Sequence, residues 1–231
     1  MNLVLLFEED FITDGVARLT GRRAEHIARV HRASEGDSLV AGIANGRIGS
    51  GTITKMTSDA VEMDVALDRD PPPPLPLTLI LALPRPKVLN RVIASATSLG
   101  VKDVHLINAW RVEKNYWKSP KLSEDNLREQ CIAGLEQARD TVLPRITLHR
   151  FFRQFAEGFT SDALKLVAHP HTSAECPRNV NEATALAIGP EGGFIAEELA
   201  SFERAGFQTV TMGERILRVE TAVAALIARL Y

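Results

Sequence analysis

A glycine-rich segment towards the end of the chain carries the least ordinary chemistry of the sequence. It reads Ile-Gly-Pro-Glu-Gly-Gly-Phe from Ile188 to Phe194, directly after an apolar run and before a segment with helical spacing. Glycines let a ligand approach the backbone, and N–H groups at a helix start are free to bind it. The spacing matches neither common phosphate-binding glycine loop, and the Glu191 carboxylate would repel phosphate. The segment predicts either a tight strand-to-helix turn or a site for a ligand without phosphate.

Two other short apolar runs end in loops that could share this site, at residues 166–170 (Leu-Val-Ala-His-Pro) and 211–215 (Thr-Met-Gly-Glu-Arg). In an open parallel sheet, ligands bind beyond the carboxyl ends of the strands, so three such loops can surround one pocket. An acidic glycine turn suits a ligand that has an adenosine to bury, no phosphate and preferably a positive centre. S-adenosylmethionine, with its sulfonium, fits that description.

Metal chemistry has a weaker basis. His169, His171 and Cys176 could be ligands, but a fourth ligand is missing and the spacing fits no zinc motif, so no metal is predicted. The only other cysteine is Cys131, and the two thiols lack C-x-x-C spacing. This excludes a disulfide framework and indicates reduced thiols.

The overall charge argues against a general polyanion binder. The chain has 27 Lys+Arg against 29 Asp+Glu and a pI near 6.3. However, residues 18–32 contain five arginines and a single acidic residue, Glu25. No stretch approaches the ~20 apolar residues of a membrane span, and no basic segment precedes the first apolar run. We expect a cytoplasmic protein without membrane contact, and the concentrated arginines are compatible with RNA contact at particular places.

The proline run Pro71–Pro74, with Pro76 after it, marks the clearest domain boundary. Before it, alternating runs predict a small β-barrel or sandwich with one helix near residues 21–33, and Asn45-Gly46 predicts a type I′ hairpin turn. The expected strands lie at residues 3–7, 38–43, 47–54 and 60–66.

After the prolines, strands and helices alternate, which predicts a parallel sheet with crossover helices. We expect strands at residues 77–83, 104–107, 164–168, 184–188 and 208–211, and helices at 87–99, 123–139, 196–205 and 219–230. Gly100 should end the first of these helices and Ser123 should cap the second. An apolar stripe on the last helix is typical of core or of a subunit interface.

The glycine segment and residues 212–222 (Met-Gly-Glu-Arg-Ile-Leu-Arg-Val-Glu-Thr-Ala) together resemble the paired signature of RsmE-type methyltransferases, in the SPOUT superfamily. The resemblance extends to residues 26–32 with 35–37, to 99–101, and to Glu136-Gln137 with Pro144. These enzymes use S-adenosylmethionine to methylate N3 of a uridine in 16S ribosomal RNA.

The resemblance implies an α/β protein with a PUA-like RNA-binding β-barrel at residues 1–70, a proline linker at 71–76, and a SPOUT methyltransferase domain at 77–231 with a C-terminal trefoil knot. It also implies a homodimer, acting on 16S rRNA alone or within the small ribosomal subunit. The cofactor would be bent in the knot and held by three loops, with these candidate residues: Val167, Ala168, His169, Pro170, Ile188, Gly189, Pro190, Glu191, Gly192, Gly193, Met212, Gly213, Arg215, Ile216 and Leu217.

Methyl transfer to uracil N3 requires a collinear arrangement and stabilisation of the charge left when N3 loses its proton. Arg218 is the candidate for that stabilisation, with Glu220 and Thr221 holding it or relaying a proton. The alternative is an Arg218–Glu220 pair that only caps the last helix. The chain departs from the family at Val219, where threonine is usual, at Ser98, where glutamate is common, and over residues 110–114.

RNA contact is expected from two groups of cations. On a helix over residues 21–33, Arg22, His26 and Arg29 would share one face. The second group lies near Trp110, Tyr116 and Trp117, which offer stacking surface unless they are core residues. The full set of RNA candidates is Arg18, Arg22, Arg23, His26, Arg29, Arg32, Arg85, Lys87, Arg111 and Lys114.

Three other functions fit parts of the sequence. The chain could be a non-catalytic RNA-binding protein that keeps the SPOUT fold, or a SPOUT methyltransferase with a different RNA nucleotide as its target. A small-molecule methyltransferase is the third, which the extra β domain and its basic helix disfavour.

Overall fold

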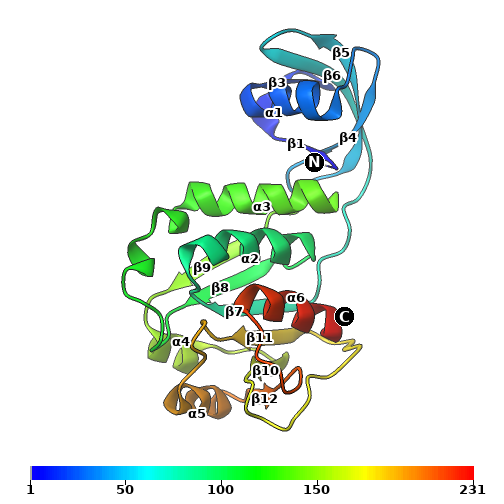
Figure 1. Ribbon diagram of the computed structural model, residues 1–231. Helices are drawn as coiled ribbons and strands as arrows, with labels where there is room; N and C mark the ends of the chain where they lie inside the picture. The colour runs from blue at the N-terminus through cyan, green and yellow to red at the C-terminus, as the bar shows by residue number, and fades with distance from the viewer. Residues whose placement is uncertain (1) are drawn as a thin grey trace. The chain divides into compact units, whose positions relative to one another are not determined.

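The computed structural model describes residues 2–231, which fold as two compact units (Figure 1). The first contains the chain up to Pro73 together with Ile132–Leu143, and the second contains Pro74–Cys131 and Pro144–Tyr231. The division near the proline run follows the composition, but residues 132–143 join the first unit from within the stretch assigned to the second.

The first unit is built on one six-stranded sheet in the order β1-β4-β5-β6-β3-β2. Its strands are β1 (Val4–Leu6), β2 (Phe11–Thr13), β3 (Val16–Thr20), β4 (Ser38–Ile43), β5 (Ile48–Met56) and β6 (Ala60–Arg69). Only β1 and β4 pair in parallel. In the β4–β5 turn Asn45 has φ of 59°, whereas Gly46 does not adopt positive φ. The predicted type I′ turn, which needs positive φ at both residues, is therefore wrong.

The helical segment after β3 differs from the prediction. The helix α1 covers Gly21–His26, and Ile27–His31 continue it as a π-helix, which ends at Arg32 with φ of 52°. A π-helix bonds i to i+5, so its turns are wider than those of an α-helix. The predicted shared face of Arg22, His26 and Arg29 assumed α-helical spacing throughout, whereas Arg29 lies in the π-helical part.

Residues 132–143 complete the first unit. The Glu136 carbonyl accepts hydrogen bonds from the N–H groups of Asn2 and Leu3 at 2.8 and 3.0 Å. Leu135 packs in a cluster with Leu3, Leu5 and Ile48, all buried. Helix α3 (Glu124–Ala138) thus contributes its last residues to this core.

The second unit contains a six-stranded parallel sheet in the order β12-β10-β11-β7-β8-β9. Its strands are β7 (Leu77–Ala82), β8 (Asp103–Ile107), β9 (Arg145–His149), β10 (Leu164–Ala168), β11 (Thr184–Ile188) and β12 (Gln208–Val210). Helices α2 (Pro86–Ser98) and α6 (Val219–Leu230) cover one face, and α4 (Phe152–Gly158) and α5 (Ala196–Arg204) cover the other (Figure 1). The predicted parallel α/β architecture is confirmed, whereas β9 and α4 were not predicted.

The residues predicted to end one helix and to begin another are confirmed in these roles. Gly100 follows the end of α2 with φ of 91°, a conformation that glycine adopts without strain. The Ser123 hydroxyl accepts a hydrogen bond from the Asn126 N–H at 3.3 Å and caps α3. The α6 stripe, including Val223, Leu226 and Leu230, is buried within the chain.

Candidate functional site

The loops after β10, β11 and β12 meet around one cavity of about 750 Å³ in the second unit. They do so because the three strands are parallel neighbours whose carboxyl ends share one edge of the sheet. Thirteen of the fifteen cofactor candidates line the cavity; the other two are Val167, buried in the sheet, and Gly213. The wall is completed by His171 of the β10 loop and by residues from other elements, including Arg85, Val88, Arg91, Arg111 and Leu226.

Backbone geometry explains the glycines of the β11 loop. Gly193 has φ of 72°, where other L-residues are strained. A Cβ on Gly189 would lie 3.1 Å from the Gly193 Cα and from the Phe194 nitrogen. A side chain at Gly189 would therefore press on Gly193 and Phe194, and at Gly193, which lines the cavity, the positive φ favours glycine.

Two neighbouring loops hold this turn in place. The Glu191 Oε1 accepts a hydrogen bond from the Arg85 backbone N–H at 3.0 Å. The Arg111 guanidinium donates to the Gly192 carbonyl. Loops that follow β7 and β8 therefore fix the acidic turn, and Glu191 remains exposed at the cavity.

A buried carboxylate, Glu198, supports the same region from behind. It is 5% exposed, and its two oxygens accept hydrogen bonds from the N–H groups of Trp110 (2.7 Å) and Ile195 (3.0 Å). The bond to Ile195 caps α5, and the bond to Trp110 ties down the loop after β8. A glutamate three residues after the N-cap is a sequence signal for the bond to Ile195. The bond to Trp110 joins residues 88 positions apart, and no local sequence pattern predicts it.

The charge of the cavity wall is positive. It contains five arginines (Arg85, Arg91, Arg111, Arg215 and Arg218) against two glutamates, Glu191 and Glu220. His169 and His171 also line the cavity, with ring centroids 5.6 Å apart. Burial, and then the neighbouring His171, lower the pKa of His169, so its ring is neutral at pH 7.

The three catalytic candidates have different surroundings. Arg218 is exposed at the N-cap of α6, lines the cavity and forms no ion pair with any described carboxylate. Glu220 accepts from the Arg91 Nη2 at 3.4 Å, so the suggested Arg218–Glu220 pair is not formed. Thr221 is exposed and lies outside the cavity lining.

The arginines of the first unit divide into structural and exposed groups. Arg23 donates to both Asp10 oxygens, at 2.6 and 2.5 Å, and to the Leu5 carbonyl. Asp10 is 6% exposed, so this pair belongs to the core of the unit. Arg29 pairs with Glu25 on the surface, and Arg18 lies 3.8 Å from Glu62. Arg22 and Arg32 are exposed, and His26 is half-buried.

In the second unit, Arg85 and Arg111 reach the cavity, whereas Lys87 and Lys114 are exposed outside its lining. Trp110 is 78% exposed, so it is not a core residue. Trp117 is half-buried and donates from Nε1 to Asn108 at 2.9 Å.

Within residues 2–231, no group of three or more His, Cys, Asp or Glu side chains is arranged to hold a metal ion. Over the same residues, no helix has the length and apolar character needed to cross a membrane.

Two protein-family models match the chain. The RNA methyltransferase domain matches residues 71–231, and the RNA methyltransferase PUA domain matches residues 19–65. Ribosomal RNA small subunit methyltransferase E of Treponema pallidum is 34% identical over 239 residues, covering 99% of this chain and 90% of the relative. Its namesake from Mycobacterium tuberculosis is 27% identical, covering 96% and 89%.

Among solved structures, ribosomal RNA small subunit methyltransferase E from Neisseria gonorrhoeae, bound to S-adenosyl methionine, superposes with a TM-score of 0.78. It is 22% identical and covers 98% of this chain and 95% of the other. A methyltransferase from Legionella pneumophila, also with S-adenosylmethionine, gives the same TM-score and identity over 99% and 96% of the two chains. The fold is therefore shared along nearly the whole length.

Proposed function

Because this chain belongs to the ribosomal RNA small subunit methyltransferase E family, we propose that it transfers a methyl group from S-adenosylmethionine to N3 of one uridine in 16S rRNA. The observation that supports this most directly is the cavity where three strand-end loops and five arginines meet.

The cavity has the features that the cofactor needs. Gly189 and Gly193 line the cavity without side chains, so a ligand can approach their backbone closely, and the exposed Glu191 carboxylate favours a cation. When bound, S-adenosylmethionine supplies the methyl group on a sulfonium. We assign the cofactor to the loops at residues 168–170, 188–193 and 212–217, with Ile216 as a 74% exposed apolar contact.

The arginines point to the second substrate. Four of the five lie outside the cofactor loops, and their guanidinium groups would attract phosphates and a uracil anion. We place the RNA on this side, with Arg85, Arg91, Arg111 and Arg218 towards it.

In this arrangement Arg218 orients the uracil and stabilises the negative charge left on the ring when N3 loses its proton. We assign the proton to a ring nitrogen of His169, which lines the cavity and whose lowered pKa favours the neutral ring. Glu220, held by Arg91, fixes the first turn of α6, which carries Arg218.

The same proposal includes the domain roles and assembly that the family resemblance implies. The first unit would be the RNA-binding PUA-like domain, and the second the SPOUT domain with its C-terminal trefoil knot. A homodimer in the cytoplasm, acting on 16S rRNA alone or in the small subunit, completes it.

The experiment is to compare nucleosides of 16S rRNA from a strain lacking the protein with those of its parent, and to treat the deficient rRNA and small subunits with purified protein and radiolabelled cofactor. We expect 3-methyluridine to be lost in the strain and restored in vitro. An unchanged nucleoside profile, or cofactor binding without transfer to either substrate, would contradict the proposal.

A further inference from the structure

The second unit has another cavity, of about 850 Å³, that shares no lining residue with the first. It lies between the outer strands β8 and β9 of the sheet and helix α4, with the residues that follow α4 along its rim. The proposed methyl transfer uses none of its residues.

One wall of this cavity is a set of contacting aromatic rings. His105 and His149 stack with ring centroids 5.0 Å apart and an interplanar angle of 27°. Phe155 lies 4.8 Å from His149 and 5.4 Å from Phe159, again between centroids. The rings are tilted to one another by 55° at His149–Phe155 and 39° at Phe155–Phe159, so a planar ligand would contact individual rings of this wall.

The two histidines also carry a defined hydrogen-bond polarity. The Asp103 Oδ2 lies 3.4 Å from the His105 Nε2 and accepts a hydrogen bond from the Thr78 hydroxyl. The Arg145 guanidinium donates to the other oxygen of Asp103, Oδ1. With His105 Nε2–H directed at the carboxylate, its Nδ1 accepts from His149 Nε2–H across 2.8 Å. The remaining ring nitrogen, His149 Nδ1, is then an acceptor, and it makes no hydrogen bond to any described residue.

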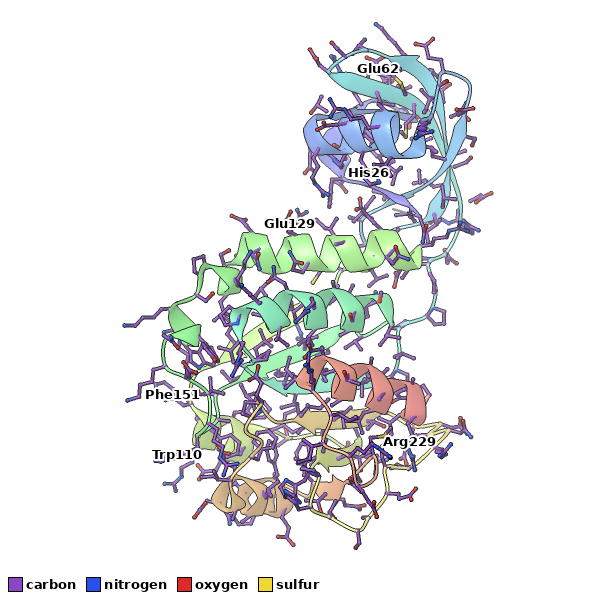
Figure 2. All side chains as sticks on the ribbon, viewed as in Figure 1. His26, Glu62, Trp110, Glu129, Phe151 and Arg229 are labelled. Carbon is purple, nitrogen blue, oxygen red and sulfur yellow. The ribbon has the colours of Figure 1, made fainter. Side chains whose placement is uncertain are left out.

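The rim adds a cation and an exposed aromatic ring. The Arg150 guanidinium lies over the Trp117 ring, 5.8 Å from its centroid, and forms no ion pair among the described residues. Phe151, the next residue, is 70% exposed. In Figure 2 Phe151 and Trp110 both lie at the left-hand edge of the second unit.

We propose that this cavity binds one unpaired nucleotide of the RNA substrate, outside the nucleotide that is methylated. The base would lie against the aromatic wall and under Phe151, an N–H of the base would donate to His149 Nδ1, and Arg150 would bind the phosphate. This inference rests on the proposed function, because it takes RNA as the partner. Unpaired bases stacked on aromatic side chains are the usual means of RNA recognition by proteins.

A free nucleotide has the same chemistry as an RNA nucleotide, so the test must separate them. Full-length protein would be crosslinked to 16S rRNA containing 4-thiouridine, without the cofactor, and crosslinked peptides would be mapped. UMP and AMP would be titrated separately. We expect crosslinks within residues 148–161, and free nucleotides that bind at least 100-fold more weakly than the rRNA. Crosslinks absent from this segment, or free nucleotide bound as tightly as rRNA, would overturn the inference.

Two variants measure the contribution of the rim. Phe151→Ala and Arg150→Gln should each weaken rRNA binding about 10-fold, and the second should also lower the salt dependence by about one phosphate contact, while cofactor affinity stays constant. Arg153→Gln is the matched control, because Arg153 is 89% exposed, pairs with Glu157 and lies outside the cavity lining. Equal affinities for all three variants would contradict the inference. Crosslinking and binding are scored without methyl transfer, so a failure of the proposed reaction would be seen separately.

Discussion

Arg91 on α2 and Glu220 on α6 form an ion pair across the two helices, with Nη2 and Oε1 3.4 Å apart. The side chains are 65% and 27% exposed, so the pair should contribute well under about 1 kcal/mol to stability. Both residues line the cavity, so we expect the pair to matter more for positioning the first turn of α6 than for stability.

We therefore predict that Arg91→Met lowers kcat for methyl transfer about 10-fold, with a melting temperature within about 2 °C of the wild type. Steady-state kinetics and thermal unfolding would measure the two effects. Unchanged kcat would show that the pair has no positioning role.

Replacing Arg218 by alanine should remove stabilisation of the uracil anion. We expect kcat to fall about 100-fold or more and cofactor affinity to change less than about twofold, because Arg218 faces the RNA side in our assignment. Arg218→Lys, which keeps the charge but loses the planar fork, should recover part of the rate. Calorimetry with the cofactor and a methylation assay would separate the outcomes, and full activity in the alanine variant would refute the role.

Arg23 should behave as a structural residue. Arg23→Ala leaves the buried Asp10 without its partner and should cost about 3 kcal/mol of unfolding free energy. Urea denaturation would measure this, with Arg29→Ala, a surface pair with Glu25, as a control that changes less than about 0.5 kcal/mol. Equal stabilities of the two variants would contradict the assignment.

Glu136 should reduce stability at neutral pH. Its side chain is 6% exposed, and the Oε1 atom has no hydrogen-bond partner. Burial is the main cause of its raised pKa, and Arg22 and Arg23 oppose the shift. Because the folded pKa lies above the unfolded one, stability from this group is present at low pH and lost as pH rises through the folded pKa.

Glu136→Gln should then raise the melting temperature at pH 8, and the difference from wild type should vanish near pH 4.5. Thermal unfolding across this range would test it. A variant less stable than wild type at pH 8 would show that the carboxylate stabilises the fold.

Two histidines should make the protein sensitive to mild acid. Burial lowers the pKa of both His149 and His169, with smaller contributions from His105 and His171. The unfolded chain, with histidine pKa values near 6.5, then binds more protons than the folded chain. The free energy of unfolding should fall as pH drops below about 6.5, and the double variant H149Q/H169Q should show a flatter dependence. Urea midpoints at pH 7.5, 6.5 and 5.5 would reveal whether the slopes differ.

Regular elements with strong local signals were predictable from the sequence. The strand at 184–188 is apolar after Thr184 and fully buried as β11, and the last helix has the bounds predicted from its apolar stripe. The match to the RNA methyltransferase domains confirms the family resemblance read from residues 188–194 and 212–222, and the PUA match confirms the type of the first domain.

Elements without such signals were missed. Strand β9 lies at the edge of the sheet and is only partly buried. Its sequence has Arg145 and His149 at its ends, so it lacks the continuous apolar run that predicts a buried strand. The short pair β2 and β3 meets through a turn at Gly15, too small to show periodicity.

The contacts that build the site were also beyond sequence reasoning. The bond from the Arg85 N–H to Glu191 spans 106 residues, and its donor is a backbone group that any residue but proline provides. Likewise, nothing in the spacing of Arg23 and Asp10 distinguished a core ion pair from a surface cation.

The placement of residues 132–143 limits how the protein could be divided or recombined. A fragment that ends at the proline run would lose the Glu136 carbonyl that binds the N–H groups of Asn2 and Leu3, together with the Leu135 side chain. A hybrid carrying the first unit of a relative would need that relative's counterpart of residues 132–143 as well. The proline run marks a change in composition, but it is not a complete boundary between the two units. The first unit also needs residues 132–143, so a sequence change in that segment affects both parts of the chain.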